Sequence, residues 1–398
     1  MVVAKGFKKT ELGNIPEDWS VLTLSDKIKV FRGGSPRPIQ SYLTENSNGI
    51  NWIKIGDTSP LSKYIVKSEE KIIPEGENRS RKVFPGDFIL SNSMSYGRPY
   101  ILKIEGCIHD GWLVLKEYQN TFNTEYLYYL LSSSIITNQY KSKASGSSVL
   151  NLNKELVKSI FLLIPSNFSE QDSITSALID VDDLINCTEA LIIKKKNIKQ
   201  GAMQQLLKPK REWVESKLTD VLDYIHGKAH EQDIVEVGKF IVVNSKFVST
   251  EGAVTKYSNS NYCPARKNDL LMVLSDLPNG KALAKCFFVE EDNKFAVNQR
   301  VCIWRSKGAD QRFLFYVLNR NKYFLALNDG VSQTHILNHH IERCRIFLPP
   351  RIHEQKEIAT ILSDIDEEIA LLESKLLKNK LIKQGMMQNL LTGKIRLI

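Results

Sequence analysis

Two long segments of the chain share one pattern of apolar positions. In residues 170–207, and again in residues 354–391, apolar side chains recur at alternating intervals of four and three residues. This spacing predicts two α-helices, each with a narrow apolar seam that requires a partner helix. At 1.5 Å per residue, each helix would be roughly 57 Å long. The predicted seam positions are Ile174, Leu178, Val181, Ile185 and Ile192 in the first helix, and Ile358, Leu362, Ile365, Ile369, Leu372 and Leu376 in the second.

In the second half of each predicted helix, the alternating spacing of four and three residues falls on polar residues. Lys195 and Asn379 stand where the next apolar seam residue would be. Apolar spacing resumes in the first helix on Ile198, Ala202 and Leu206. We therefore expect a register shift in this part of the helices.

Shorter patterns in the remainder of the chain predict mixed globular modules. Short runs rich in β-branched and apolar residues predict strands, at residues 51–55, 87–90, 239–243 and 270–274. Residues 126–131 and 313–318 predict helices, because they lie in longer stretches with few helix breakers. The sequence therefore predicts the α+β class, with a curved antiparallel sheet in each module.

The chain contains an internal repeat. Residues 165–210 align with residues 349–394 without a gap, at a constant offset of 184, and 20 of the 46 positions are identical. The repeat continues upstream more faintly, where Trp19 aligns with Trp213 and Gly33 with Gly227. The predicted order is module, helix, module, helix. We place the first module at residues 1–155, its helix at 156–208, the second module at 209–340 and its helix at 341–398.

The charges of the two helices predict how they pair. Residues 170–189 contain six acids and no base, whereas residues 190–211 contain seven bases and no acid. The second copy repeats this, with seven acids and one base in 354–373 and six bases in 375–398. Each exposed ion pair contributes only about 0.5 kcal/mol, but a whole helix of them selects the antiparallel orientation. Two equal antiparallel helices imply pseudo-two-fold symmetry.

Composition narrows the class of protein only moderately. The 398 residues include 54 Lys+Arg and 45 Asp+Glu, a net charge of +9 that favours a polyanionic partner such as nucleic acid. The sequence has no signal-like apolar start and no run of about 18 apolar residues, so we expect a cytoplasmic protein that does not span a membrane. The six cysteines lie far apart and are expected to be reduced packing residues.

Several motifs resemble those of one known family. They are E-L-G-N-I-P-E-D-W at residues 11–19, P-G-D-F-I-L-S-N-S at residues 85–93, and the paired E-Q helices that end in K-Q-G-x-M-Q-x-L-L. With the order module, helix, module, helix, the chain resembles the specificity subunit of Type I restriction–modification systems over essentially its whole length.

The resemblance implies a function and a set of partners. In that family, two target recognition domains each read one part of a split sequence in double-stranded DNA. The helices act as a ruler between the domains and as docking surfaces for two methyltransferase subunits, which the restriction subunits join. By this resemblance, residues 11–155 and 209–340 would be the recognition domains.

Motifs for catalysis by the chain itself are missing from the sequence. It has no phosphate-binding G-x-x-x-x-G-K-[ST] loop, no F-x-G-x-G loop for S-adenosylmethionine and no N-P-P-[YF] motif. The pairs His226/His230 and His339/His340 are expected to be surface or packing residues, so we predict no metal and no cofactor. A non-catalytic binding subunit is therefore expected. A scaffold or adaptor that does not bind DNA, and a DNA enzyme acting alone, are the alternatives.

The residues expected to read DNA lie in polar loops of the two modules. Arg and Lys suit phosphates, whereas Arg, Asn, Gln, Ser and Thr suit base edges; each loop could equally be an ordinary polar loop. In the first module the candidates are Arg37, Arg79, Arg81, Lys82, Ser91, Asn92, Ser93, Tyr96 and Arg98. In the second they are Lys256, Tyr257, Arg266, Lys267, Ser275, Asn279, Lys281, Asn298, Gln299, Arg300 and Gln333, which is followed by Thr334 and His335. Trp19 and Trp213 are expected to pack at the start of each domain.

Overall fold

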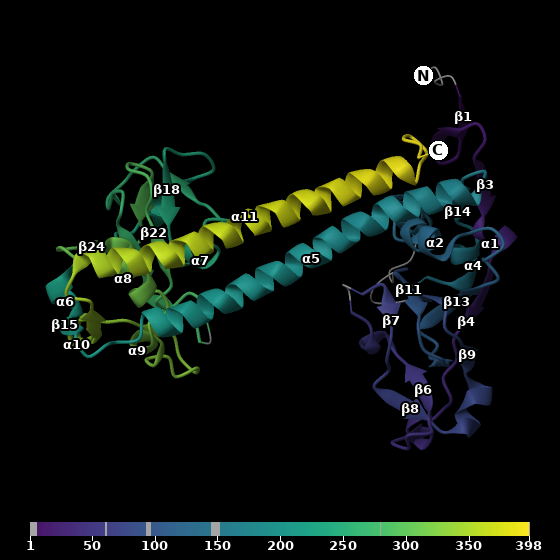
Figure 1. Cartoon of the computed structure of the whole chain (residues 1–398), viewed down its shortest axis with the longest axis horizontal. Helices are drawn as coiled ribbons and strands as arrows, with labels where there is room; N and C mark the ends of the chain where they lie inside the picture. The colour runs from purple at the N-terminus through teal and green to yellow at the C-terminus, as the bar shows by residue number, and fades with distance from the viewer. Residues whose placement is uncertain (1–5, 60–61, 93–96, 145–151, 279, 398) are drawn as a thin grey trace. The chain divides into compact units, whose positions relative to one another are not determined.

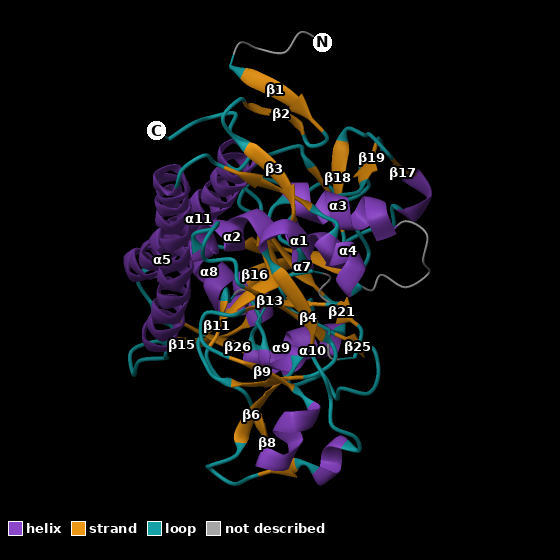
Figure 2. Ribbon diagram, turned by 90° about the vertical axis from the view of Figure 1, so that its right-hand side faces the viewer, coloured by secondary structure: helices purple, strands orange, loops and turns teal. Residues whose placement is uncertain are grey.

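Each predicted seam lies on one continuous helix. Helix α5 runs from Phe168 to Leu206 and helix α11 from Ile352 to Leu390, the two longest helices in Figures 1 and 2. The computed structural model describes residues 6–59, 62–92, 97–144, 152–278 and 280–397. The chain forms two units, residues 1–189 with 375–398 and residues 190–374. Each unit therefore contains one module together with one half of each long helix.

The two helices run antiparallel in both units. In the first unit, Asp182 and Glu189 of α5 pair with Lys383 and Lys380 of α11, at 2.5 and 2.7 Å. The residue number of the partner on α11 falls as the residue number on α5 rises, so the two helices run antiparallel. In the second unit the repeated residues form the same pairs with the helices exchanged: Asp366–Lys199 at 2.5 Å and Glu373–Lys196 at 2.7 Å. The predicted antiparallel packing of equivalent helices is confirmed.

The seam continues through the polar positions without a change of spacing. Seven predicted seam residues are buried, and Val181, Ile365, Leu372 and Leu376 are half-buried. Beyond them, Asn379 keeps the seam spacing and is 6% exposed, and Lys195 is half-buried and pairs with Glu368. Ile198, by contrast, is 46% exposed. The expected register shift is therefore wrong: the helices retain the spacing and accept polar side chains in the seam.

The first module contains two five-stranded sheets. One has the order β4-β13-β10-β11-β7, with strands Lys29–Arg32, Trp112–Lys116, Phe88–Ser91, Pro99–Leu102 and Tyr64–Ile65. The other has the order β5-β8-β6-β12-β9, with strands Leu43–Thr44, Glu70–Ile72, Ile50–Ile53, Gly106–Ile108 and Arg81–Val83. Helices α2, α3 and α4 follow the sheets, at Thr124–Leu131, Ser134–Ala144 and Lys154–Lys158.

The second module repeats this plan with fewer strands. Its first sheet has the order β16-β24-β20-β22, with strands Leu222–His226, Val301–Ser306, Leu270–Val273 and Cys286–Phe288. Its second has the order β17-β19-β18-β23, with strands Ile234–Val235, Tyr257–Ser258, Phe240–Val243 and Phe295–Val297. Helices α7, α8 and α9 are Ser245–Ser249, Gln311–Leu318 and Lys322–Leu325, and the short strands β21 and β25 are Ser275–Asp276 and Thr334–His335.

Three of these four sheets are mixed, which differs from the antiparallel sheet expected, whereas the sheet β16-β24-β20-β22 of the second module is antiparallel throughout, as predicted. Strands β6 and β12 run parallel, as do β18 and β23, and β7 runs parallel to β11. The four predicted strands and two predicted helices are present, with bounds shifted by one or two residues. The α+β class is confirmed, but the parallel pairs form between segments 37 to 55 residues apart in the sequence, which local patterns do not reveal.

The same contacts attach each module to the helices. Trp19 Nε1 donates to Glu170 at 3.0 Å and Trp213 Nε1 donates to Glu354 at 3.4 Å. The Tyr129 hydroxyl donates to Asp182 at 2.7 Å, and that of Tyr316 to Asp366 at 2.9 Å. Both tryptophans are buried. The acidic half of each helix therefore also provides the acceptors that hold the module.

The buried seam gives a prediction on stability. Leu178 is fully buried, so Leu178→Ala leaves a cavity and should lower the free energy of unfolding by about 2–5 kcal/mol. Leu184, on the same helix, is 43% exposed, and Leu184→Ala should change it by no more than about 0.5 kcal/mol. Urea unfolding followed by circular dichroism measures both. Equal losses would show that the seam does not stabilise the helix pair.

Candidate DNA interface

In each module, a short turn leads from a strand of one sheet into a strand of the other. In the first module, β12 leaves its parallel partner β6 and turns through residues 109–111 into β13. In the second, β23 leaves β18 and turns through residues 298–300 into β24. The turns close with the same hydrogen bond, Trp112 N–H to His109 O at 3.1 Å and Val301 N–H to Asn298 O at 2.9 Å. The two turns are therefore structural equivalents.

The glycines that align in the sequence repeat lie against these turns. Gly33 N–H donates to Trp112 O at 2.8 Å, and Gly227 N–H donates to Val301 O at 3.0 Å. A Cβ atom on Gly33 would lie 2.0 Å from His109 O, and one on Gly227 would lie 2.1 Å from Asn298 O. Only glycine allows this approach of backbone to backbone, which explains why both copies have it.

A pocket of about 790 Å³ lies beside the turn of the first module. Asp110 connects the loops around it: its carboxylate accepts from Ser35 Oγ at 2.8 Å, and its carbonyl accepts from Asn92 Nδ2 at 2.9 Å. The Ser35 hydrogen bond lowers the pKa of the Asp110 carboxyl group, which is therefore ionised at neutral pH. The lining residues are Ser35, Pro36, Arg37, Pro38, Ile39, Trp52, Lys54, Ile55, Gly56, His109 and Asp110.

The His109 ring forms part of this wall as a neutral group. Burial lowers the pKa of His109, and its Nδ1 lies 2.8 Å from the Gly111 N–H, which donates to it. His109 and Trp52, both part of the lining, were not among the sequence candidates. No local signal distinguishes them from packing aromatic residues, because their shared position depends on the parallel pairing of β6 and β12.

The structure places two candidates of the first module, Arg37 and Asn92, in contact with Asp110, and two more, Arg79 and Arg81, on neighbouring segments. Arg37 lies 3.5 Å from the Asp110 carboxylate and is largely exposed. The backbone of Arg79 lies beside Gly34, whose Cβ would be 3.2 Å from the Arg79 carbonyl oxygen, and its guanidinium lies over the Tyr42 ring, 5.7 Å from the centroid. Arg81 donates to the carbonyl of Arg32 at 3.4 Å. The three arginines are exposed, whereas Asn92 is half-buried.

The remaining candidates of this module are placed differently. Lys82 is paired with Glu77 and Glu105, at 2.8 and 3.1 Å. Ser91 is fully buried, so its side chain is not available at the surface. Arg98 lies over the ring of Tyr100, 5.6 Å from its centroid. Ser93 and Tyr96 lie outside the described residues.

A pocket of about 540 Å³ occupies the equivalent place in the second module. The residues that follow β18 line it, just as the residues that follow β6 line the first pocket. Five sequence candidates from four separate loops meet here. The lining residues are Glu231, Ile234, Asn244, Ser245, Lys246, Ser249, Lys256, Ser275, Asp276, Leu277, Ala282, Asn298, Arg300 and Gln333.

Hydrogen bonds fix the amide side chains of this pocket. Asn298 Nδ2 donates to Glu231 at 3.0 Å, and Gln333 Nε2 donates to Ser275 Oγ at 3.2 Å. Pairing of β21 with β25 sets His335 opposite Ser275 and so brings Gln333 into the pocket. The exposed amide of Gln333 offers both donors and acceptors to a base edge, whereas Asn298 is 7% exposed and its Oδ1 already accepts from Gln299 N–H at 2.7 Å.

Three exposed cations surround the same pocket. Lys246, Lys256 and Arg300 form no ion pair with any residue that the structure describes. They are therefore available to neutralise phosphates. Lys246 and Asn244 were not among the sequence candidates, because only the parallel pairing of β18 with β23 brings their segment beside residues 298–300.

The other candidates of the second module lie elsewhere. Arg266 and Lys267 precede β20, whereas Ser275 follows it, so these two bases lie at the opposite end of the strand. Tyr257, on β19, accepts a hydrogen bond from Thr255 at 3.2 Å. Gln299 is half-buried beside Asn298, and Lys281 is exposed next to the pocket residue Ala282. Asn279 lies outside the described residues.

Comparison with known proteins identifies the family. The sequence profile of the Type I restriction modification DNA specificity domain matches residues 16–197 and 210–381, one match for each copy of the repeat. The chain therefore belongs to this family and is a DNA sequence-recognition subunit, not a catalytic one.

All six of its cysteines are free thiols.

Similar proteins span the whole chain. The MjaVIII specificity subunit of Methanocaldococcus jannaschii is 24% identical, over 98% of this chain and 96% of its own length. The putative MjaX specificity subunit of the same organism is 26% identical, over 98% and 97%. A solved structure of a Type I restriction–modification system has a TM-score of 0.64 at 16% identity, covering 96% of this chain and 99% of that one. The S subunit from M. genitalium has a TM-score of 0.60 at 13% identity, covering 98% of both chains.

The described part of the chain adds two observations. None of its helices is long and apolar enough to cross a membrane. No group of three or more His, Cys, Asp or Glu side chains within it is arranged to hold a metal ion.

The close approach of Gly227 to the turn is testable. Gly227→Ala places a methyl group against Asn298 O, and we expect the free energy of unfolding to fall by about 1–3 kcal/mol. Gly201, in α5, has open space around it, so Gly201→Ala should leave stability unchanged or raise it by up to about 1 kcal/mol. Chemical denaturation of both variants measures the difference. Similar values for the two would show that the turn tolerates a side chain.

Proposed function

We propose that the two equivalent pockets read the two halves of a bipartite, asymmetric site in double-stranded DNA. The observation that carries the proposal is that the same turn, closed on the same glycine, carries different side chains in the two modules. The first pocket presents Trp52, His109 and Asp110, whereas the second presents Asn298 and Gln333. Two pockets with the same backbone arrangement but different lining side chains suit two half-sites of different sequence.

Each pocket combines the two kinds of group that sequence-specific binding requires. Exposed cations at the rim can bind phosphates and fix the position of the duplex. Amides and carboxylates within the pocket can bind base edges, since Asn and Gln suit adenine and a carboxylate accepts from the amino group of cytosine. Arg37, Arg79 and Arg81 would bind phosphates in the first module, and Lys246, Lys256 and Arg300 in the second.

The paired helices would hold the partners that the family resemblance implies. We propose that they dock two methyltransferase subunits and, through these, the restriction subunits. The helices carry exposed apolar side chains in each unit, such as Leu377 and Leu381 in the first and Leu191 and Ile193 in the second. Exposed apolar groups on a helix pair are typical of surfaces that bind another protein.

DNA binding by the second pocket is tested by one substitution and its matched control. Arg300→Ala should weaken binding to the cognate duplex and make the slope of log K against log salt shallower by about 0.9, since one phosphate contact is lost. Arg266→Ala removes an exposed arginine outside the pocket and should leave the slope unchanged. Fluorescence anisotropy over a series of salt concentrations measures both slopes. Affinity for duplex DNA that does not depend on salt would instead favour a scaffold that does not bind DNA.

Base reading is tested by methylome sequencing of cells that contain the chain and its methyltransferase. Asn298→Ala and Gln333→Ala should relax one half-site and leave the other intact, because each pocket belongs to a single module. The control is Asn338→Ala, an exposed residue at the start of helix α10 (Asn338–Arg343) and outside the pocket lining, which should leave both half-sites intact. A change in both half-sites would contradict independent reading by the two modules.

The ruler role of the helices predicts a change in spacing. Insertion of one heptad into both helices adds about 10.5 Å of helix, which corresponds to about three base pairs. The recognised half-sites should remain the same while the spacer between them changes. The same methylome measurement gives the result, and an unchanged spacer would contradict the ruler.

A further inference from the structure

The edge of one sheet differs between the modules. In the first module, β11 lies between β10 and the short strand β7, which pairs with it through Tyr64 and Ile65. In the second module, β22 occupies the place of β11 beside β20. There β22 is the edge strand, and no strand of the described chain pairs with its outer side.

Hydrogen bonds define the equivalence of β11 and β22 residue by residue. Leu102 N–H donates to Asp87 O at 3.0 Å, and Val289 N–H donates to Asp269 O at 2.9 Å. Ile101 lies opposite Phe88, just as Phe288 lies opposite Leu270. Phe288 is therefore the counterpart of Ile101.

The backbone N–H that points to the outer side of the sheet at this position forms a hydrogen bond in the first module only. Ile101 N–H donates to the carbonyl of Lys63, in the segment that includes β7, at 3.0 Å. In the second module, Cys286 N–H donates to Asn319 at 3.0 Å, so residues 286 and 288 direct their backbone groups away from β20. Because Val289 N–H bonds to β20, the N–H of Phe288 points to the outer side of β22, where no described strand pairs. An unpaired edge of this kind is a template for another strand.

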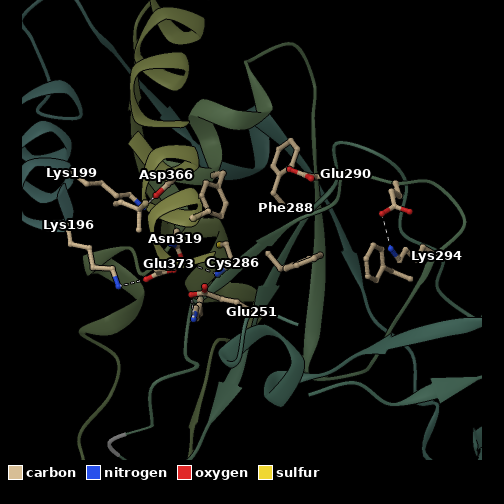
Figure 3. A pocket seen from close by; sticks show the side chains of 17 residues that line it. Lys196, Lys199, Glu251, Cys286, Phe288, Glu290, Lys294, Asn319, Asp366 and Glu373 are labelled. Carbon is tan, nitrogen blue, oxygen red and sulfur yellow. Dashed lines mark hydrogen bonds and ion pairs between the residues drawn. The ribbon is translucent and has the colours of Figure 1, made fainter. Parts of the chain in front are cut away.

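A pocket of about 740 Å³ lies over this edge (Figure 3). Phe287, Phe288 and Phe315 line it and are half-buried. The counterparts of Phe287 and Phe288 beneath the covering strand, Tyr100 and Ile101, are 1% and 2% exposed, whereas Tyr128, the counterpart of Phe315, is half-buried as Phe315 is. The second module therefore leaves an aromatic surface partly exposed where the first module covers the equivalent surface with its own chain.

The charges at the rim indicate what the missing strand would carry. Charged side chains around the pocket form ion pairs with one another, such as Lys196–Glu373 and Lys294–Glu291 (Figure 3). In the first module, Glu125 of α2 holds the covering strand, accepting from Lys63 and from the Tyr64 hydroxyl, each at 2.6 Å.

The aligned residue of α8 is Arg312, which reverses this charge. Arg312 lies over the Phe288 ring at 3.9 Å and pairs with Glu290 at 3.2 Å, while the Glu290 side chain is 71% exposed. A strand over β22 would therefore meet a guanidinium where the first module presents a carboxylate, and an acid at the place of Lys63 could replace the exposed Glu290 as the partner of Arg312.

We propose that an extended, acidic segment of the methyltransferase subunit adds to the outer edge of β22 as a further strand. Main-chain hydrogen bonds to Phe288 would provide the register, the aromatic residues would be buried, and a carboxylate of the segment would pair with Arg312. This inference rests on the proposed docking of methyltransferase subunits, but it places a contact on the recognition module in addition to the helices.

Hydrogen–deuterium exchange of the full chain tests the proposal, alone and in complex with its methyltransferase subunits. We expect the amides of residues 286–290 to exchange on the order of tenfold more slowly in the complex. If the complex forms and these amides are not protected, strand addition is wrong while the proposed function stands. If no complex forms, both proposals fail. Protection that appears in the chain alone as its concentration rises would assign the edge to a second copy and overturn the proposal.

A charge reversal provides an independent measurement. Arg312→Glu should raise the Kd for the methyltransferase subunit about tenfold. Lys322→Glu, on α9 outside the pocket lining, makes the same change in net charge and should leave the Kd unchanged. Thermal unfolding confirms that both variants are folded. An Arg312→Glu chain that binds the methyltransferase as tightly as the control would contradict an acidic partner at this position.

Discussion

The antiparallel pairing of α5 and α11 is the constraint on which the other features depend. Each helix is acidic in its first half and basic in its second, so only the antiparallel arrangement sets opposite charges beside each other. Individual surface ion pairs stabilise weakly, yet the same pairs occur in both units with the helices exchanged. The apolar seam is buried, at Leu178 and Leu362 within the core of each module, and the charges select the orientation of the helix pair.

The module contacts extend this arrangement. Asp182 both pairs with Lys383 and accepts from Tyr129, and Asp366 does the same with Lys199 and Tyr316. One carboxylate therefore links helix to helix and helix to module in each unit. A change at this position would disturb the packing of the helices and the placement of the module together.

The sequence predicted the features that arise from local periodicity. The seam spacing, the polarity of charge and the ungapped repeat were sufficient for the helices, their antiparallel pairing and the α+β class. The predicted register shift was wrong because a helix seam need not be apolar at every position. The aliphatic stem of Lys195 and the small amide of Asn379 occupy seam positions at which the sequence pattern predicted that the seam would be interrupted.

The candidate site was predicted less completely, because it depends on pairings between distant segments. Polar loops pointed to Lys256, Ser275, Asn298, Arg300 and Gln333, which the second pocket brings together. Lys246 and His109 were missed, since only the parallel strand pairs place their segments beside the turns. Ser91 was included from a polar loop motif, but it ends a strand whose residues are all buried.

The glycine-closed turn also bears on how such a protein can change its specificity during evolution. Its closing contacts join backbone to backbone, through Gly33 in one module and Gly227 in the other. The fold of the turn therefore depends little on which side chains it carries. If the pockets read DNA as proposed, substitutions of their exposed side chains would alter the target sequence while these backbone contacts of the turn remain.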